Sequence, residues 1–380
     1  MLRRKSSGQV KTRRWLAGVL AVLVCLLGGC ASGMQAPSSE APSPASSSPP
    51  PVVSEPEPEV EVLAPLPLAD GVNALTGLAQ PDEMQAGQRP VAVMVSNNER
   101  SLPQRGLAQA DVLVEMLTEG GISRLMALYA DYRTVPLVGP VRSTRDAFVQ
   151  FALPCDAIMA HIGTSVYAKN LLEVMDEKTV DGLYLGRTAY WFDADRSNPR
   201  PGGKLHEYCW FTNAELIWAG MEAIDVHPTG EVRTLFRFAK APVQPQQSAV
   251  RVDAVYAPGV SSAAFHYDTA AGLYHKFMGE HPHTDEDGGQ LSFTNVVLLE
   301  CGVSLKPDGL CTELDMRGGE GWVFTMGGAQ QVVWRKGAPE EALRLFTPEG
   351  EEIEVNPGKS YVGFVPDDVE NGIQFSAQSA

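Results

Sequence analysis

The sequence predicts a mixed fold of the α+β or α/β class, with an N-terminal mixed α/β domain followed by a smaller, mostly β C-terminal domain. Up to about residue 228, apolar runs typical of buried strands alternate with segments of helical spacing. From about residue 229 on, short alternating segments are separated by Gly, Pro and Asp, which indicates a β-meander or a barrel-like fold. With 380 residues, of which 44% are hydrophobic, the chain can bury a sizeable core.

The first thirty residues have the pattern of a lipoprotein signal peptide. Six basic residues precede an apolar run from Trp15 to Leu27, which is short for a membrane span. Gly28 and Gly29 then lead to Cys30, and this stretch resembles a bacterial lipobox, in which the Cys carries acyl chains such as palmitate. A plain signal peptide and a transmembrane anchor are the alternatives. We expect an acylated Cys30 to hold the protein on the outer side of the cell membrane.

Residues 31–70 are rich in Ser, Pro and Glu, and we expect them to form a disordered tether. The two globular domains are then expected at residues 71–228 and 229–370. Of the 30 Lys and Arg residues, six lie in the first thirty positions, where no acid occurs, so the rest of the chain carries 24 basic and 46 acidic residues. Such a charge argues against a nucleic-acid partner, because binding a polyanion needs a basic surface.

The elements of the N-terminal domain follow from apolar spacing. Strands are predicted at residues 89–97 and 156–163, and two more within 110–130 around a Gly-Gly turn. Helices are predicted at 143–153, 164–177 and 213–224, the last after an irregular stretch at 185–212. In the C-terminal domain, strands are predicted at 233–239, 249–257, 263–268, 272–278, 294–303, 321–328, 329–337, 343–350, 351–358 and 360–366.

Two arginines stand where a loop turns into a helix, in the stretch LVGPVRSTRD. Ser143 is expected to be the N-cap and Asp146 its capping-box partner. Arg145 then falls in the first turn, where the helix dipole disfavours a cation. A bound anion would compensate, held by Arg142, Arg145 and backbone N–H groups. The alternative is a salt bridge to one of three acids, Asp111, Glu115 or Glu119.

The stretch HIGTS repeats this arrangement with a strand, a glycine, hydroxyl residues and a helix that opens at Thr164 or Ser165. If both preceding strands are parallel neighbours, both helices begin at the carboxyl ends of strands, where open α/β sheets bind ligands. For His161, the alternative is a purely structural hydrogen bond. The predicted anion cradle comprises Arg142, Ser143, Arg145, His161, Thr164 and Ser165.

The stretch TEGGISR predicts a tight glycine turn between two strands. In one interpretation Arg124 joins the basic cluster and Glu119 orients it. In the other, the two residues form a cross-strand ion pair of a simple hairpin.

The irregular stretch YWFDADRSNPRPGGKLHEYCWFT places six aromatic residues among basic ones, including His206. Aromatic faces beside basic groups suit a sugar or a glycan phosphate. The alternative is that these aromatics fix a long loop onto its own core. A metal site at His281 and His283 is weighed against an acidic β-turn in GEHPHTDEDGG, and the turn is preferred.

Four cysteines follow the predicted leader: Cys155, Cys209, Cys301 and Cys311. In an exported protein they can pair, and Cys301 with Cys311 is the local candidate. Free, buried thiols are the alternative.

These segments together resemble the YerB-like family of bacterial lipoproteins, whose domains have no known function. The resemblance covers nearly all of residues 73–366 and implies an N-terminal α/β-type domain and a smaller C-terminal domain outside the cytoplasmic membrane. Where the family typically has Pro-His-Asn, this chain has Leu205, His206 and Glu207, so that Asn is missing as a partner for His206. The resemblance rests on NALTGL, SNNERSLPQRGLAQADVLVEMLTEGGISRLMALYA, VGPVRSTRDAFVQFA, HIGTS, HPHTDEDGGQLSFTNVVLL and EEIEVNPGKSYVGFVP.

The sequence favours an envelope-anchored binding module that holds an anionic or glycan ligand at the cradle, Arg124 and His206. Its expected partners are the membrane, through the lipid, and a glycan or phosphate-containing envelope component, without a cofactor or metal. One alternative is an enzyme that transfers or hydrolyses phosphoglycosyl units of cell-wall polymers, with Glu115 or Glu119 acting on a proton or a metal. Another is a protein-interaction scaffold that docks through its β half. The sequence leaves binding and catalysis both open.

Overall fold

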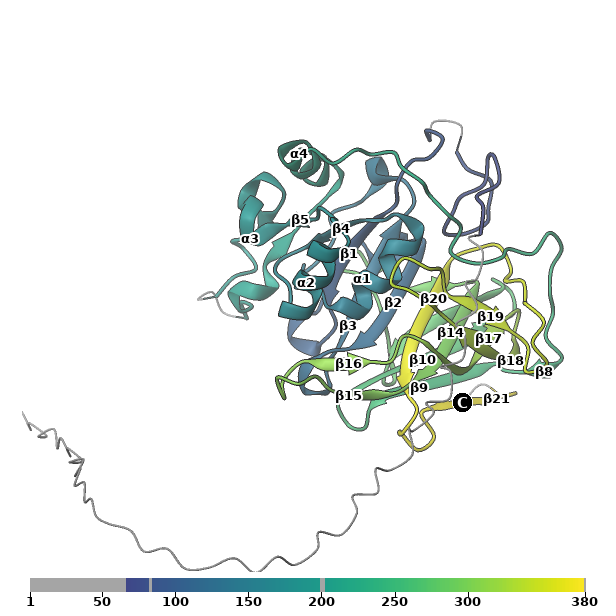
Figure 1. Cartoon of the computed structure of the whole chain (residues 1–380). Coiled ribbons are helices and arrows are strands. Elements are labelled where there is room, and N and C mark those ends of the chain that lie inside the picture. Colours follow the sequence, from purple (N-terminus) through teal and green to yellow (C-terminus); the bar gives the residue numbers. More distant parts are fainter. Residues whose placement is uncertain (1–65, 82–83, 199–201, 379–380) are drawn as a thin grey trace, which may run out of the picture. The chain divides into compact units, whose positions relative to one another are not determined.

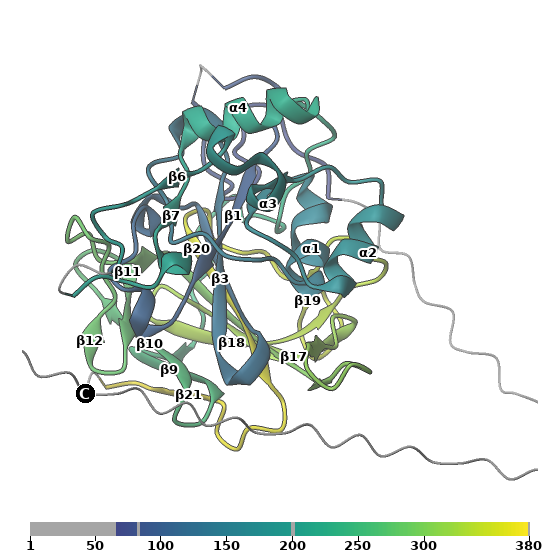
Figure 2. The same ribbon diagram turned by 90° about the vertical axis from the view of Figure 1, so that its left-hand side faces the viewer.

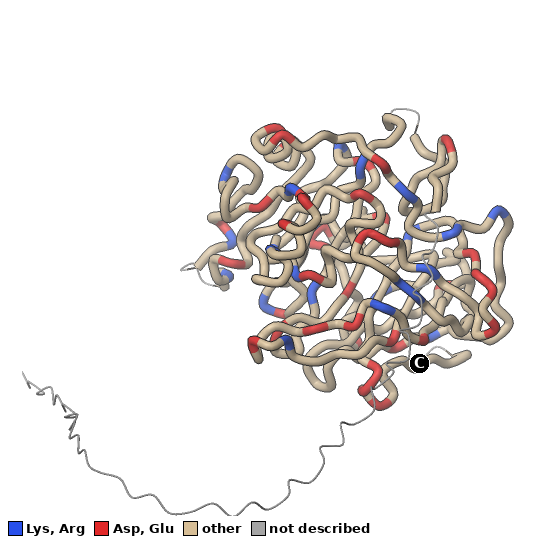
Figure 3. The backbone as a smooth tube through the Cα atoms, in the orientation of Figure 1, with Lys and Arg blue, Asp and Glu red and all other residues tan. Residues whose placement is uncertain are grey.

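A large sheet that spans both halves of the sequence organises the computed structural model, which describes residues 66–81, 84–198 and 202–378 (Figure 1). The predicted signal peptide, the lipidation site Cys30 and nearly all of the predicted tether lie outside the described residues. Acidic positions are interspersed with basic ones along the described chain (Figure 3).

The N-terminal half supplies five strands of this sheet. Strands β1, β4 and β5 run parallel, and the antiparallel hairpin β2–β3 pairs with β1 through β3. Every residue of β1, β2 and β3 is buried, which agrees with their continuous apolar runs. The bounds are β1 (Val91–Ser96), β2 (Val112–Leu117), β3 (Ser123–Tyr129), β4 (Ile158–His161) and β5 (Val180–Asp181).

The C-terminal half completes the same sheet. Strand β20 pairs in parallel with β2, from Val112↔Ser360 to Glu115↔Gly363. The order across the sheet is β19-β18-β17-β14-β20-β2-β3-β1-β4-β5, and β8 pairs with β18. The mixed N-terminal part and the mostly β C-terminal part, both as predicted, are therefore joined by backbone hydrogen bonds. The bounds are β8 (Gln247–Ser248), β14 (Asn295–Cys301), β17 (Gly318–Thr325), β18 (Gly328–Arg335), β19 (Arg344–Phe346) and β20 (Ser360–Pro366).

A second sheet comes from the C-terminal half alone, in the order β12-β11-β10-β9-β21 with β13 beside β11. Strand β9 alternates buried and half-buried residues, which is typical of a sheet with one covered face. The bounds are β9 (Arg251–Ala257), β10 (Ser261–Asp268), β11 (Leu273–Met278), β12 (His281–Pro282), β13 (Ser292–Phe293) and β21 (Ile373–Ser376). Two short hairpins are β6 (Trp191–Phe192) with β7 (Trp210–Phe211) and β15 (Val303–Leu305) with β16 (Thr312–Leu314).

The large sheet has a different cover on each face (Figures 1 and 2). Helices α1 and α2 pack on one face, where Phe148, Phe151 and Ala152 are buried on a shared side as predicted. The second sheet and helix α4 pack on the opposite face. The bounds are α1 (Asp146–Ala152), α2 (Val166–Val174), α3 (Gly182–Leu185) and α4 (Ala214–Ile224).

The structure corrects three local predictions. Helix α1 begins at Asp146 with Arg145 as its N-cap, so Ser143 is not the cap, because the backbone of Thr144 stays extended and bonds to Gly163 instead. The segments 233–239 and 351–358 are not strands, and they share the single bridge Phe238↔Val355. Prolines, which have no N–H donor, limit further pairing near this bridge, at Pro242 and Pro357.

Candidate functional site

The two loops that precede α1 and α2 lie side by side. The N–H of Thr144 donates to the carbonyl of Gly163 at 3.0 Å, and the N–H of Ile162 donates to the carbonyl of Arg142 at 3.1 Å. The predicted meeting of the two helix starts is therefore present. The parallel neighbours are β1 and β4, whereas the segment before α1 forms an antiparallel bridge to β1 through Val141.

Ser165 is the N-cap of α2, one of the two positions, Thr164 or Ser165, at which the sequence predicted the helix to open. Its Oγ accepts a hydrogen bond from the N–H of Ala168 at 3.1 Å, which satisfies one free donor of the first helical turn. Thr164 is half-buried, and its backbone is bridged to Thr144. Both residues fix the position of the loop next to the arginines.

Arg145 is paired with an acid of its own chain. Its Nε and Nη2 donate to the two carboxylate oxygens of Glu119, each at 2.6 Å, in a two-point ion pair. Burial opposes ionisation of this carboxyl, but the hydrogen bonds and charge of Arg145 hold the pKa of Glu119 below its usual range. The alternative in which a salt bridge compensates Arg145 is therefore realised, and Glu119 orients Arg145 rather than Arg124.

Arg124 is the guanidinium that lacks such a partner. It lies on β3 with 8% of its surface exposed, and its Nη1 donates to the carbonyl of Ser143 at 2.6 Å. Within the described residues, no carboxylate oxygen lies within 4.0 Å of it. Burial, together with the charges of Arg145 and Arg142, lowers the pKa of Arg124 to about 9. It is still a cation at pH 7, with its charge only partly compensated.

Arg142 lies at the solvent side of the same group. Its side chain is 27% exposed, and its guanidinium lies 5.5 Å from the ring centre of Tyr208. Its contact with Glu207 is long, at 3.9 Å between Nη1 and Oε1, and the Glu207 side chain is 48% exposed. Such an exposed pair is weak, so Glu207 leaves most of the hydrogen-bonding capacity of Arg142 unused. We call Arg124, Arg142, Arg145 and Glu119 the arginine cluster.

His161 lies apart from the arginine cluster. It is fully buried, its Nε2 is 2.9 Å from Oγ1 of Thr179, and its Nδ1 is 3.8 Å from Oδ1 of Asp181. Burial lowers the pKa of His161, against the charge of Asp181. Asp181 also accepts hydrogen bonds from the N–H groups of Gly163 and Leu183, so it stabilises the loop that precedes α2.

His206 belongs to a group of aromatic rings on the β6–β7 hairpin. Its ring centre is 4.7 Å from Phe192 and 5.6 Å from Trp210, and the Phe192 and Trp210 rings are 5.0 Å apart. His206 is exposed, and the other two are half-buried. We call these three residues the aromatic platform.

The C-terminal half reaches the start of α1. The Nζ of Lys306, which follows β15, lies 2.9 Å from the carboxylate of Asp146 and also contacts Glu313 and the ring of Tyr167. Asp146 is therefore held by a distant lysine rather than used in a capping box.

A buried polar network, which sequence reasoning missed, joins the two sheets. The carboxylate of Glu115 accepts hydrogen bonds from Asn97, Ser123 and Tyr361 at 2.9, 2.6 and 2.7 Å, and Nζ of Lys276 lies 3.5 Å away. Glu115 and Lys276 have no exposed surface. Burial lowers the pKa of Lys276, and the charge of Glu115 opposes this. The closest sequence signal was a charged residue inside each of two predicted strands.

His283 extends the network. Because the ammonium of Lys276 can only donate, Nδ1 of His283 accepts from it at 3.1 Å, and Nε2 then donates to Gln104 at 2.5 Å. Burial and the charge of Lys276 lower the pKa of His283 far below its usual value. Within the described chain, no group of His, Cys, Asp or Glu side chains is arranged to hold a metal ion.

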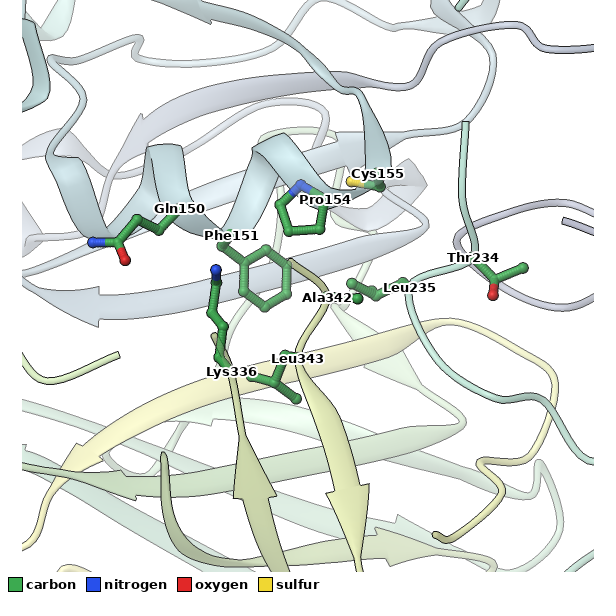
Figure 4. Close-up of a pocket in the computed structure, with 9 residues that line it drawn as sticks. All are labelled: Gln150, Phe151, Pro154, Cys155, Thr234, Leu235, Lys336, Ala342 and Leu343. Carbon is green, nitrogen blue, oxygen red and sulfur yellow. The ribbon is translucent and has the colours of Figure 1, made fainter. Parts of the chain in front are cut away.

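Two hollows lie away from the arginine cluster. A cavity of about 10 Å³, room for about one water, is lined by residues such as Phe151, Cys155 and Lys336, and Lys336 points toward α1 (Figure 4). An open groove of about 970 Å³ is lined partly by Arg237 and Arg344, and both of these pair with Glu352. No member of the arginine cluster lines either hollow.

The four cysteines of the described chain are free thiols, so the local pairing considered for Cys301 and Cys311 is absent there. Burial raises the pKa of Cys155 and of Cys301 to about 12, so both are protonated at neutral pH. Among the described helices, none has the length and apolar character needed to cross a membrane.

Comparison with known families decides the classification. Residues 75–226 match the N-terminal domain of a protein family of unknown function, DUF3048, and residues 252–362 match its C-terminal domain. The chain belongs to the DUF3048 family. The first of these DUF3048 segments contains the arginine cluster and the aromatic platform, and the second contains Lys276 and His283.

A related protein and a solved structure support the same classification. The chain is 28% identical over 295 residues to "Putative lipoprotein YerB" of Bacillus subtilis (strain 168), covering 77% of this chain and 86% of that protein. The crystal structure of YerB protein from Bacillus subtilis matches the fold with a TM-score of 0.69 at 25% identity, over 80% of this chain and 99% of that one. The resemblance inferred from the sequence motifs is thus confirmed.

Proposed function

We propose that this DUF3048 protein is a lipid-anchored binding module of the cell envelope that holds an anionic ligand at the arginine cluster. The observation that carries the proposal is the state of Arg124, a buried cation without a carboxylate partner among the described residues. A buried charge is costly unless it is paired, and an anion beside Arg124 would supply the missing partner.

The neighbouring groups fit such a ligand. Arg142 is partly exposed and only weakly engaged by Glu207, so it offers donors that a ligand reaches from solvent. Ser143 lies between Arg142 and Arg145 in the sequence and is half-buried. Its hydroxyl makes no hydrogen bond within the described part of the chain. Arg145 is held by Glu119, which compensates its charge, so we do not expect Arg145 to contact the ligand.

The proposal of membrane anchoring rests on the sequence before residue 66 and on the similarity to "Putative lipoprotein YerB" of Bacillus subtilis. An acylated Cys30 followed by the Ser, Pro and Glu tether would hold the binding module outside the membrane. The proposed ligand is accordingly a phosphate-containing or glycan component of the envelope.

The geometry supports binding more than catalysis. Glu115 is enclosed in the buried network, and Glu119 is tied to Arg145 with a lowered pKa, which is the wrong direction for a general acid. Neither acid considered for an enzyme is therefore arranged to exchange a proton with a bound substrate.

Calorimetric titration of inorganic phosphate into the mature chain, residues 30–380, tests the proposal. We expect Arg142→Ala to weaken binding by about tenfold or more, because a charge-assisted hydrogen bond is lost. Arg317→Ala is the matched control, since Arg317 is 87% exposed, pairs with Asp315 and lies outside the cluster. Equal affinities of wild type and Arg142→Ala would contradict the proposal.

A further inference from the structure

The aromatic platform is attached directly to the arginine cluster. The N–H of Val141 donates to the carbonyl of Trp210 at 2.8 Å, so strand β7 runs beside the residue that precedes Arg142. His206 and Tyr208 belong to one helical turn, and Arg142 lies over the ring of Tyr208. The backbone therefore places the platform next to the partly exposed guanidinium of Arg142. Strands β6 and β7 are labelled in Figure 2.

The opposite face of the β6–β7 hairpin is the one that fixes the loop to the core. Phe211 is fully buried, and its ring centre lies 6.0 Å from that of Trp191 in a tilted contact. The guanidiniums of Arg105 and Arg196 lie 4.5 and 5.5 Å from the ring centre of Phe211. Arg196 also donates to the carbonyl of Tyr208 at 3.0 Å. None of these contacts involves Phe192 or His206, which belong to the aromatic platform.

The platform keeps three rings together, of which Phe192 and Trp210 are half-buried and His206 is exposed. Phe192 and Trp210 are register partners, and Nε1 of Trp210 donates to Nδ1 of His206 at 3.4 Å. The indole and the imidazole therefore hold each other in place, although His206 itself is exposed. Preordered aromatic rings with a polar edge suit the apolar C–H face and the hydroxyl rim of a sugar ring.

We infer that the ligand is a sugar that carries an anionic group, with the sugar ring against Trp210 and His206 and the anionic group at Arg142 and Arg124. The inference rests on the proposed function, since the arginine cluster supplies the charged half of the site. The shared chemistry is a phosphate or carboxylate on a pyranose ring, and the two sources are separated by the probes below.

Titration of four probes into the mature chain tests this inference: glucose 1-phosphate, glucuronate, glucose and inorganic phosphate. We expect the phosphorylated or the carboxylated sugar to bind about two- to tenfold more tightly than inorganic phosphate, because a stacked ring adds a contact of modest strength. Preference for glucose 1-phosphate identifies a phosphate-bearing sugar, and preference for glucuronate a carboxylate-bearing one.

Three variants separate the two halves of the site. Trp210→Leu and His206→Ala are expected to remove the advantage of the anionic sugar while the affinity for inorganic phosphate stays within twofold of wild type. Arg142→Ala is expected to weaken both. The melting temperature of Trp210→Leu shows whether this substitution disturbs the β6–β7 hairpin. Because His206 is exposed, His206→Ala tests the platform even if Trp210→Leu does disturb it.

The outcomes distinguish this inference from the proposed function. Binding of inorganic phosphate that depends on Arg142, without any advantage of an anionic sugar, overturns the sugar inference and leaves the anion site in place. An advantage of the anionic sugar that persists in both platform variants also overturns it. Absence of binding by all four probes contradicts the site as a whole.

Discussion

Arg145 and Glu119 are joined by two parallel hydrogen bonds of 2.6 Å, although 26 residues separate them in the sequence. Glu119 thus compensates the charge of Arg145, one of the three guanidiniums of the arginine cluster. Arg124 has no carboxylate partner among the described residues. The proposed anion site therefore depends on Arg124 and Arg142, with Arg145 in a supporting role.

Glu119→Gln is expected to lower the free energy of unfolding by about 1–3 kcal/mol, since a charge-assisted pair of a half-buried arginine is lost. It should also raise the affinity for inorganic phosphate, because the cluster gains one net positive charge. Urea denaturation and calorimetry measure the two effects. A variant that binds phosphate more weakly despite an intact fold would show that Glu119 is needed to shape the site.

Glu207→Gln is expected to tighten phosphate binding by about two- to fivefold, because the exposed carboxylate near Arg142 no longer competes with the ligand. The effect should shrink at high salt, which screens exposed charges. Glu280→Gln is a matched control, as an exposed acid on a different arginine, Arg251. Similar changes in the two variants would mean that the effect arises from net charge alone.

The lysine at the small cavity predicts a pH dependence of stability. Burial lowers the pKa of Lys336 to about 8, from 10.5 in the unfolded chain, and its side chain is 4% exposed. Between these values the unfolded state binds more protons, so stability rises with pH through this window. Relative to Lys336→Met, the wild type should gain on the order of 2 kcal/mol from pH 7.5 to pH 10.5.

Urea denaturation of both proteins across this range measures the difference. Other groups that titrate in the same window, including Arg124 with its pKa of about 9, are common to the two proteins and cancel. A difference in stability that does not change with pH would show that Lys336 keeps an ordinary pKa.

Lys276→Met is expected to destabilise the fold by about 3–5 kcal/mol, because Glu115 then remains buried without its cation. The double variant Glu115→Gln with Lys276→Met should lose less than the sum of the two single variants, since each single change leaves a partner behind. Thermal or urea unfolding measures all three. Additive losses would indicate that the 3.5 Å contact contributes no coupling.

Sequence periodicity predicted the strands and helices whose apolar residues are contiguous along the chain, such as the β2–β3 hairpin and α2 with its cap Ser165. It placed the cap of α1 wrongly at Ser143, because the bond that keeps Thr144 extended comes from Gly163, nineteen residues away. A local capping rule does not contain that contact.

Partners far apart in the sequence account for what the sequence could not predict. Glu115 and Lys276 meet only because β2 pairs with β20 and the second sheet covers that face. The continuous sheet depends on the pairing of residues 112–115 with 360–363, and no local sequence pattern predicts this pairing. For the site, the sequence left three acids open as partners of Arg145, and the choice of Glu119 among them required the fold.

The sharpest test of the anion site is an anomalous diffraction map from crystals of residues 30–380 soaked in selenate, because selenate is a tetrahedral oxyanion like phosphate and its selenium marks its position. We expect a selenium peak within hydrogen-bonding reach of the guanidiniums of Arg124 and Arg142. A map in which selenate occupies other surface sites but leaves this position without a peak, with a carboxylate of the chain against Arg124, would contradict it.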